Sequence, residues 1–179
     1  IRRALTTLAQ RVSIRREEVV SVSDDGAVAL ASGTVVQAGR VLICAGVQTP
    51  ALFGPLDVEF LPHTRVTYAG ADARGAACLS APEGYGLPLG STGRWAFGQN
   101  VPDTATVHAL FPSLVPVDQV DCVTVRAPWL DSGGDGWMVA RRGRVVAFVG
   151  SNLMKLGPLL GELLAQSMLS DKLPSEFYF

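Results

Sequence analysis

VVAFVGSNLMKLGP, residues 145–158, is the stretch of this chain that says most about its fold. A short apolar strand over residues 145–149 runs through Gly150 into a helix start, where Pro158 suits the first turn. Backbone N–H groups at a helix N-terminus lack intrahelical partners and lie at the positive end of the helix dipole, so they favour an anionic or electron-rich ligand. Lys155 adds a full positive charge there. We therefore expect this junction of strand and helix to face a cofactor.

The helix that follows is expected to bury one face. Its apolar residues fall at helical spacing, whereas Glu162 and Gln166 lie off that stripe. The stripe consists of Leu156, Leu159, Leu160, Leu163, Leu164 and Met168. The alternative is an ordinary core helix with a solvated Lys155. A lysine at a helix start is electrostatically unfavourable, however, which favours a specific role for it.

A second segment, RVLICAGVQTP at residues 40–50, is typical of a strand that ends close to a ligand. The continuous apolar run from Val41 to Cys44 predicts a fully buried parallel strand. Ala45 and Gly46 then leave room for a ligand to approach the backbone.

These two segments resemble parts of the superfamily of FAD-dependent oxidoreductases that contains D-amino-acid oxidase, sarcosine oxidase and glycine oxidase. The resemblance implies that FAD binds at Ala45, Gly46, Gly150, Ser151, Asn152, Leu153, Met154 and Lys155. It also implies the reaction: a hydride leaves the carbon beside the nitrogen of an amine or amino acid for flavin N5, and water hydrolyses the imine. Lys155 falls on the position of a lysine that helps to hold the substrate carboxylate in sarcosine-oxidase-like members, whereas Leu153 replaces a glycine of their pattern.

The same resemblance points to three residues in the middle of the chain. Tyr85 resembles a tyrosine that lines the substrate pocket, with aromatic packing under a turn as the alternative. Arg65 resembles an arginine at the pocket edge, with a surface cation as the alternative. Cys122 lies where some sarcosine-oxidase-like members attach FAD covalently. Asp121 beside it opposes formation of a thiolate, which favours a structural cysteine instead.

Two classes of function follow. The first is the catalytic C-terminal half or subunit of a flavin-dependent amine or amino-acid oxidoreductase, in which Lys155 would anchor a carboxylate. The second is a non-catalytic structural or partner subunit that keeps the flavoprotein fold without bound FAD. Leu153 favours the second class, as do Ala96 and Asn100, which stand where relatives carry a lysine and a histidine. Lys155 and the Ala45–Gly46 pair favour the first.

A partner is expected because the dinucleotide fingerprint of the superfamily, G-x-G-x-x-G between a strand and a helix, does not occur in the sequence. The run GYGLPLG at residues 84–90 has the wrong spacing, and Pro88 interrupts any helix start, so it predicts a turn. The chain begins at Ile1 in a segment that resembles a mid-chain helix of the superfamily. We expect a C-terminal half that acts as a heteromer with an N-terminal FAD-binding half or subunit carrying the fingerprint.

Composition narrows the remaining possibilities. The 179 residues are 48% hydrophobic and 17% charged, which is apolar for a free-standing soluble protein and again suggests a partner. A net charge of −1 gives no electrostatic reason to expect nucleic acid or an anionic membrane. No apolar run approaches the roughly 20 residues of a membrane span.

Three cysteines without C-x-x-C spacing predict free thiols in a reducing, cytoplasmic compartment. His63 and His108 lack neighbouring ligands, so no metal site is expected.

The order of predicted elements indicates an α/β (α+β) fold in three stretches. Residues 1–54 form the C-terminal part of a Rossmann-like FAD-binding domain, with a helix, a β-meander and the buried parallel strand. Residues 55–128 form an antiparallel substrate-binding sheet, because short strands separated by Gly, Pro and Asp are not βαβ units. Residues 129–179 return to the FAD-binding domain and end in the C-terminal helix. Strands are expected over 12–14, 19–22, 27–30, 34–37, 58–61, 66–69, 76–80, 95–97, 120–126, 138–140 and 145–149.

Overall fold

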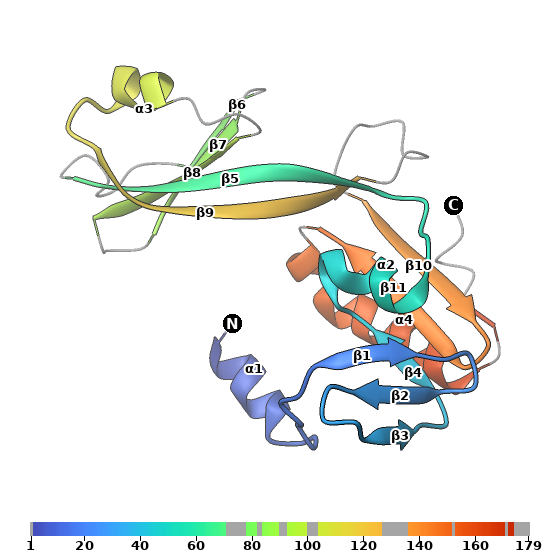
Figure 1. Ribbon diagram of the computed structural model, residues 1–179. Helices are drawn as coiled ribbons and strands as arrows, with labels where there is room; N and C mark the ends of the chain where they lie inside the picture. Colours follow the sequence, from blue (N-terminus) through green and yellow to red (C-terminus); the bar gives the residue numbers. More distant parts are fainter. Residues whose placement is uncertain are drawn as a thin grey trace. The chain divides into compact units, whose positions relative to one another are not determined.

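The computed structural model describes residues 2–70, 78–81, 84–89, 93–99, 104–126, 136–151, 153–170 and 172–173. The chain divides into two compact units, which Figure 1 shows with their elements labelled. The first unit comprises Ile1–Leu56, Met138–Val149 and Met154–Phe179, and the second comprises Asp57–Trp137 and Gly150–Leu153.

The first unit combines two three-stranded sheets with helices. Its elements are α1 (Arg2–Ala9), β1 (Val19–Val22), β2 (Ala27–Leu30), β3 (Val35–Gln37), β4 (Val41–Ile43), the 3₁₀ helix η1 (Gly46–Gln48), α2 (Thr49–Phe53), β10 (Trp137–Arg142), β11 (Val145–Gly150), the 3₁₀ helix η3 (Leu153–Leu156) and α4 (Gly157–Leu169). Three of these elements, β10, β11 and η3, each have one terminal residue in the second unit. One sheet is the antiparallel meander β1-β2-β3, whose turns contain Gly26 at φ 90° and Gly33 at φ 84°. The other has the order β10-β11-β4, and β11 is parallel to β4.

The core of the first unit joins these two sheets to α2. It consists of Val22, Ile43, Phe53, Val145 and Ala147. Helix α4 begins with proline in its first turn, as predicted, and buries Leu160, Leu163, Leu164 and Ser167. The prediction for Leu159 is wrong, because the buried face is centred on the row 160, 163, 164 and 167, and Leu159 is exposed.

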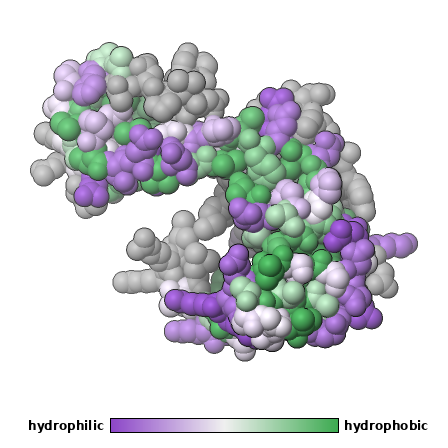
Figure 2. All heavy atoms as spheres, in the orientation of Figure 1, coloured by the Kyte–Doolittle hydropathy of each residue, from purple (hydrophilic) through white to green (hydrophobic). Residues whose placement is uncertain are grey.

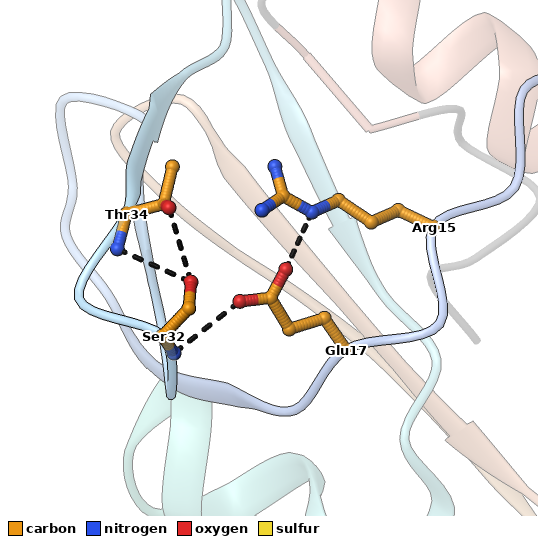
Figure 3. Close-up of polar contacts among 4 residues, drawn as sticks. All are labelled: Arg15, Glu17, Ser32 and Thr34. Carbon is orange, nitrogen blue, oxygen red and sulfur yellow. Dashed lines mark hydrogen bonds and ion pairs between the residues drawn. The ribbon is translucent and has the colours of Figure 1, made fainter.

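The segment before β1 is held by polar contacts, and the strand predicted over residues 12–14 is absent from the structure. In Figure 3, Arg15 Nε donates to the Glu17 carboxylate, and the Ser32 backbone N–H donates to Glu17 Oε1 at 3.3 Å. Hydrogen bonds from Ser32 lower the pKa of Glu17 below its usual 4.5, and Arg15 adds to the effect. These contacts tie the segment to the turn between β2 and β3, where the Ser32 hydroxyl donates to Thr34 Oγ1 at 3.0 Å.

The second unit is built on one antiparallel sheet of five strands in the order β6-β7-β8-β5-β9. Its elements are β5 (Glu59–Ala69), β6 (Leu79–Ala81), β7 (Gly84–Pro88), β8 (Arg94–Gln99), α3 (Thr104–Leu110) and β9 (Val115–Arg126). Its core consists of Val66, Tyr68, Trp95, Phe97, Val107 and Leu114. The predicted fold class, a meander and a parallel strand pair together with an antiparallel sheet, is confirmed.

Two predictions in this sheet are wrong. The turn predicted over residues 84–90 is replaced by strand β7. The two strands predicted over 58–61 and 66–69 are one strand, β5, which continues through Pro62. Proline fits there because β8 pairs with β5 only from Thr64 onward, so the missing N–H of Pro62 interrupts no bond on that side.

None of the described helices is both long enough and apolar enough to cross a membrane. Apolar side chains nevertheless reach the surface of both units, as the green atoms of Figure 2 show. In the first unit they include Val20, Val35 and Val36, and in the second they include Val115, Val117, Val120 and Val123 of β9.

Candidate functional site

The sheet of the second unit has a core face and an opposite face. Val66 lies opposite Phe97, and Tyr68 lies opposite Trp95, and all four belong to the core. Because successive side chains of a strand point to opposite faces, the residues between them point away from the core.

That opposite face, which we call the open face, gathers three of the residues selected from the sequence. Arg65 lies opposite Gly98, and Gly98 lies opposite Tyr85, in one row across β5, β8 and β7. In the next row, His63 lies opposite Cys122 of β9. Directly opposed residues of an antiparallel pair project to the same side. Arg65, Tyr85 and Cys122 therefore share the open face, where Arg65 and Cys122 are exposed and Tyr85 and His63 are half-buried.

His63 and Tyr85 interact directly on this face. Their rings stack with centroids 5.8 Å apart and an interplanar angle of 20°. His63 Nε2 and Tyr85 Oη are 3.3 Å apart and hydrogen-bonded. Sequence reasoning missed His63 as a site residue, because a lone histidine carries no signal until the strand register places it beside Tyr85.

Ala96, at a position where the resemblance implies a positive charge, also belongs to the open face. It lies opposite Thr67 on one side and Leu87 on the other. Ala96 and Thr67 are both buried, whereas Leu87 is exposed. The other such position, Asn100, lies outside the described residues.

Asp121 does not lie beside the Cys122 thiol, which corrects the expectation from the sequence. Neighbours in a strand point to opposite faces, and Asp121 is paired with Thr64 instead. Its carboxylate accepts hydrogen bonds from Thr64 Oγ1 at 3.0 Å and from Gln119 Nε2 at 3.3 Å. Cys122 is thus an exposed free thiol opposite a histidine.

In the first unit, the predicted ligand-facing turn follows β4. Ala45 and Gly46 are exposed, and the Ala45 N–H donates to Thr49 Oγ1 at 3.2 Å, which fixes the turn against the buried start of α2. Gly46 has φ 56°, and among the described residues no atom beyond its two chain neighbours lies within 4 Å of where a Cβ would stand. The backbone here is open to a ligand.

Strand β4 itself is only half-buried, and the prediction of a fully buried strand is wrong. Val41 and Leu42 are intermediate in exposure, and Ile43 is buried. Among the described residues, β11 is the one strand that pairs with β4, which leaves its other edge open.

We expect the thiol of Cys44, which directly follows β4, to react slowly despite its exposure. Partial burial of the thiol removes water that would stabilise the thiolate and so raises the pKa of Cys44 above its usual value. Less thiolate therefore forms near neutral pH. In the isolated chain at pH 8, alkylation by iodoacetamide followed by mass spectrometry should label Cys44 after Cys78 and Cys122, which are also free and exposed. Labelling of Cys44 before the other two would contradict this account.

The segment from Gly150 to Leu153, at the end of β11, packs within the second unit. A Cβ on Gly150 would lie 2.4 Å from Leu153 Cδ1 and 2.8 Å from Trp137 Cβ, so the Leu153 side chain already packs onto this glycine. Ser151 Oγ accepts a hydrogen bond from the Val125 N–H at 2.6 Å. Gly150, Ser151 and Leu153 therefore have contacts within the protein that account for their positions.

The residues that follow lead into the start of α4. The backbone of Met154 and Lys155 lies in η3, directly before α4, and the residue that precedes the helix, Leu156, makes no side-chain cap. The N-terminal N–H groups of α4 thus lack a side-chain acceptor from the cap position. Asn152 and the side chains of Met154 and Lys155 lie outside what the structure describes.

No group of three or more His, Cys, Asp or Glu side chains in the described part of the chain is arranged to hold a metal ion.

Solved structures of oxidases share this fold. Iminodiacetate oxidase from Chelativorans sp. BNC1 matches with a TM-score of 0.70 and 14% identity, over 97% of this chain and 55% of that one. Amadoriase I, a fructosyl amine:oxygen oxidoreductase from Aspergillus fumigatus, matches with a TM-score of 0.65 and 17% identity, over 89% of this chain and 46% of that one. Glycine oxidase from Geobacillus kaustophilus matches with a TM-score of 0.58 and 16% identity, over 83% of this chain and 46% of that one.

The chain thus spans about half the length of the solved structures that it matches. No family model and no curated protein sequence matches it. The fold implied by the resemblance is confirmed: the chain shares the fold of about half of iminodiacetate oxidase, amadoriase I and glycine oxidase.

Proposed function

We propose that this chain is the C-terminal half or subunit of a flavin-dependent oxidoreductase that oxidises a C–N bond of an amine or amino acid. The observation that carries the proposal is the open face, where strand register brings together Arg65, Tyr85 and Cys122. The names of the matched proteins, which act on iminodiacetate, glycine and fructosyl amines, support an amine or amino acid as substrate.

FAD fits one of its two predicted contacts better than the other. At the end of β4, Gly46 offers exposed backbone and free space, as close approach of a cofactor requires. At Gly150, the corresponding space is filled by Leu153 and Trp137, so this glycine serves packing. When bound, FAD supplies the acceptor for the hydride that leaves the carbon beside the substrate nitrogen.

The side chains of the open face would bind and orient the substrate. Arg65 is always charged and presents a fork of donors that matches a carboxylate. The Tyr85 hydroxyl can donate to the same group or accept from the substrate nitrogen. For Lys155, whose backbone lies just before α4, the predicted role as an anchor for a substrate carboxylate stays a proposal.

An N-terminal half or subunit that carries the G-x-G-x-x-G fingerprint is the proposed partner. Among the described residues one edge of β4 is unpaired, which supports such a partner because a parallel strand is normally buried between neighbours. The 12-residue strand β9 also pairs on one edge alone among the described residues, and it exposes several valines. Long apolar edges of this kind are usually covered by another strand or chain. A cytoplasmic location remains a prediction.

A non-catalytic subunit that keeps the fold without FAD is the alternative. Two observations favour it: Leu153 occupies the space over Gly150, and Ala96 gives the open face no charge where relatives carry one. This subunit would use the exposed β4 and β9 edges for assembly alone.

Flavin absorbance of the chain purified with its partner separates these two functions. For the catalytic half, we expect flavin bands that bleach when an amine or amino acid is added without oxygen. If chain and partner stay colourless after incubation with FAD, the catalytic proposal fails and the structural subunit stands. Acid precipitation then tests whether FAD is attached covalently to Cys122, because attached flavin would leave its colour in the protein pellet. In that case Cys122→Ser should move the flavin to the supernatant, whereas the control Cys44→Ser should leave it in the pellet.

A further inference from the structure

Gly98 is the point on the open face where two aromatic side chains meet. A Cβ at this position would lie 2.6 Å from Tyr85 Cζ, 2.7 Å from Tyr85 Oη and 2.9 Å from His63 Nε2. Real side chains do not approach so closely, so both rings lean over the Gly98 backbone. The glycine is required because any side chain here would separate the pair.

The register explains why His63 and Tyr85 meet although they lie on different strands. Tyr85 stands opposite Gly98 on β7, and Arg65 stands opposite Gly98 on β5. His63 is two residues from Arg65 and therefore on the same face of β5. The Tyr85 ring reaches across the empty position of Gly98 to the row of His63, where the two rings stack.

The hydrogen bond between the rings decides what the tyrosine hydroxyl can offer to a ligand. A hydroxyl has one proton and two acceptor lone pairs. If His63 Nε2 accepts that proton, Tyr85 presents only lone pairs to the open face. If Nε2–H donates instead, the hydroxyl keeps its proton for another acceptor. Arg65, on the same face, is permanently cationic and favours an anionic group as that acceptor.

We propose that His63 is a positioning residue whose Nε2–H donates to Tyr85 Oη, so that the Tyr85 proton is directed to an anionic group of the ligand beside Arg65. This proposal deepens the proposed function, and it rests on that function only where it takes the ligand to be the substrate. The contact between His63 and Tyr85 stands on geometry alone and can be tested without activity.

The first test is ¹H–¹⁵N NMR of the imidazole groups in the full chain labelled at histidine. The sequence contains two histidines, and His108, which lies edge-on to Tyr68, serves as the internal reference. We expect the His63 proton on Nε2, and we expect Tyr85→Phe to shift the His63 signals and leave those of His108 in place. Gly98→Ala should change the His63 signals in the same way. An unprotonated Nε2, or His63 signals that do not respond to Tyr85→Phe, would overturn the proposal.

The second test uses the FAD-loaded complex and separates positioning from folding. Removing the donor with His63→Leu should raise KM for a carboxylate substrate about tenfold with little change in kcat. His63→Gln keeps an N–H donor, so its KM should stay close to that of the unchanged chain. Equal KM values for the Leu and Gln variants would overturn the positioning role. If the NMR result holds and no FAD-loaded complex forms, the proposed function fails while the histidine–tyrosine pair stands.

Discussion

Replacing Gly86 with alanine is expected to destabilise the second unit by about 3 kcal/mol, at the upper end of the cost of overpacking a core. The added Cβ would lie 2.2 Å from Trp95 Cζ2 and 2.7 Å from Trp95 Cη2. Trp95 is fully buried and packs edge-on against Phe111 at a centroid distance of 4.5 Å, so its ring cannot move aside without displacing the core. Urea unfolding followed by circular dichroism should show a lower midpoint with an unchanged slope.

Two further variants show whether the clash is the cause. Gly161→Ala is the matched control, because no described atom outside the adjoining backbone of α4 lies within 4 Å of its added Cβ. Alanine stabilises a helix by about 0.5–1 kcal/mol relative to glycine. Trp95→Phe removes the ring atoms that the new methyl would meet. The double variant should therefore lose less stability than the two single changes added together. An unchanged urea midpoint for Gly86→Ala would mean that β7 does not pack over Trp95 as described.

The elements that the sequence predicted well are those whose signal is local. Strands β4 and β11 follow from continuous apolar runs, and α4 follows from apolar residues at helical spacing after Pro158. The turns of the meander follow from Gly26 and Gly33, which adopt positive φ. Local patterns of this kind do not depend on which strands become neighbours.

The composition of the open face could not be derived in this way, because it depends on strand register. Tyr85, Arg65 and Cys122 share a face only because β7, β8, β5 and β9 pair with particular offsets. A slip of one residue would turn every side chain of a strand to the other face. The resemblance supplied these three residues, but it gave no reason to add His63 or Gly98.

Arg141 illustrates the same limit in the first unit. The sequence gives no reason to separate it from the exposed arginines near it. In the structure its guanidinium donates to the carbonyl oxygens of Ser167 and Ser170 at the end of α4, and Arg40 also donates to Ser170. The last carbonyls of a helix lack intrahelical partners, so these two arginines satisfy them from other elements. Pairings of this kind follow from tertiary packing.

Replacing Arg65 with methionine in the FAD-loaded complex is expected to raise KM for an amino-acid substrate about 10- to 100-fold. Arg65 is the cation in the row that contains Tyr85 and Gly98, and a hydrogen bond to a charged group contributes about 1.5–3 kcal/mol. The carboxylate itself does not change in the reaction, so we expect its binding energy to be expressed almost equally in the ground state and the transition state. We therefore expect kcat to change much less than KM.

The carboxamide of the same amino acid supplies the decisive comparison, because it keeps the reacting C–N bond and lacks the anionic group. Arg65→Met should leave KM for the carboxamide nearly unchanged. Arg94→Met is the matched control, since Arg94 lies on the same face of β8 about 13 Å along the strand from Gly98, too far to share a carboxylate with Tyr85. An equal rise in KM for the acid and the carboxamide would indicate that Arg65 has a structural role. An unchanged KM for both would indicate that Arg65 is a surface cation. A loss confined to the acid would identify the open face as the place where the substrate carboxylate binds.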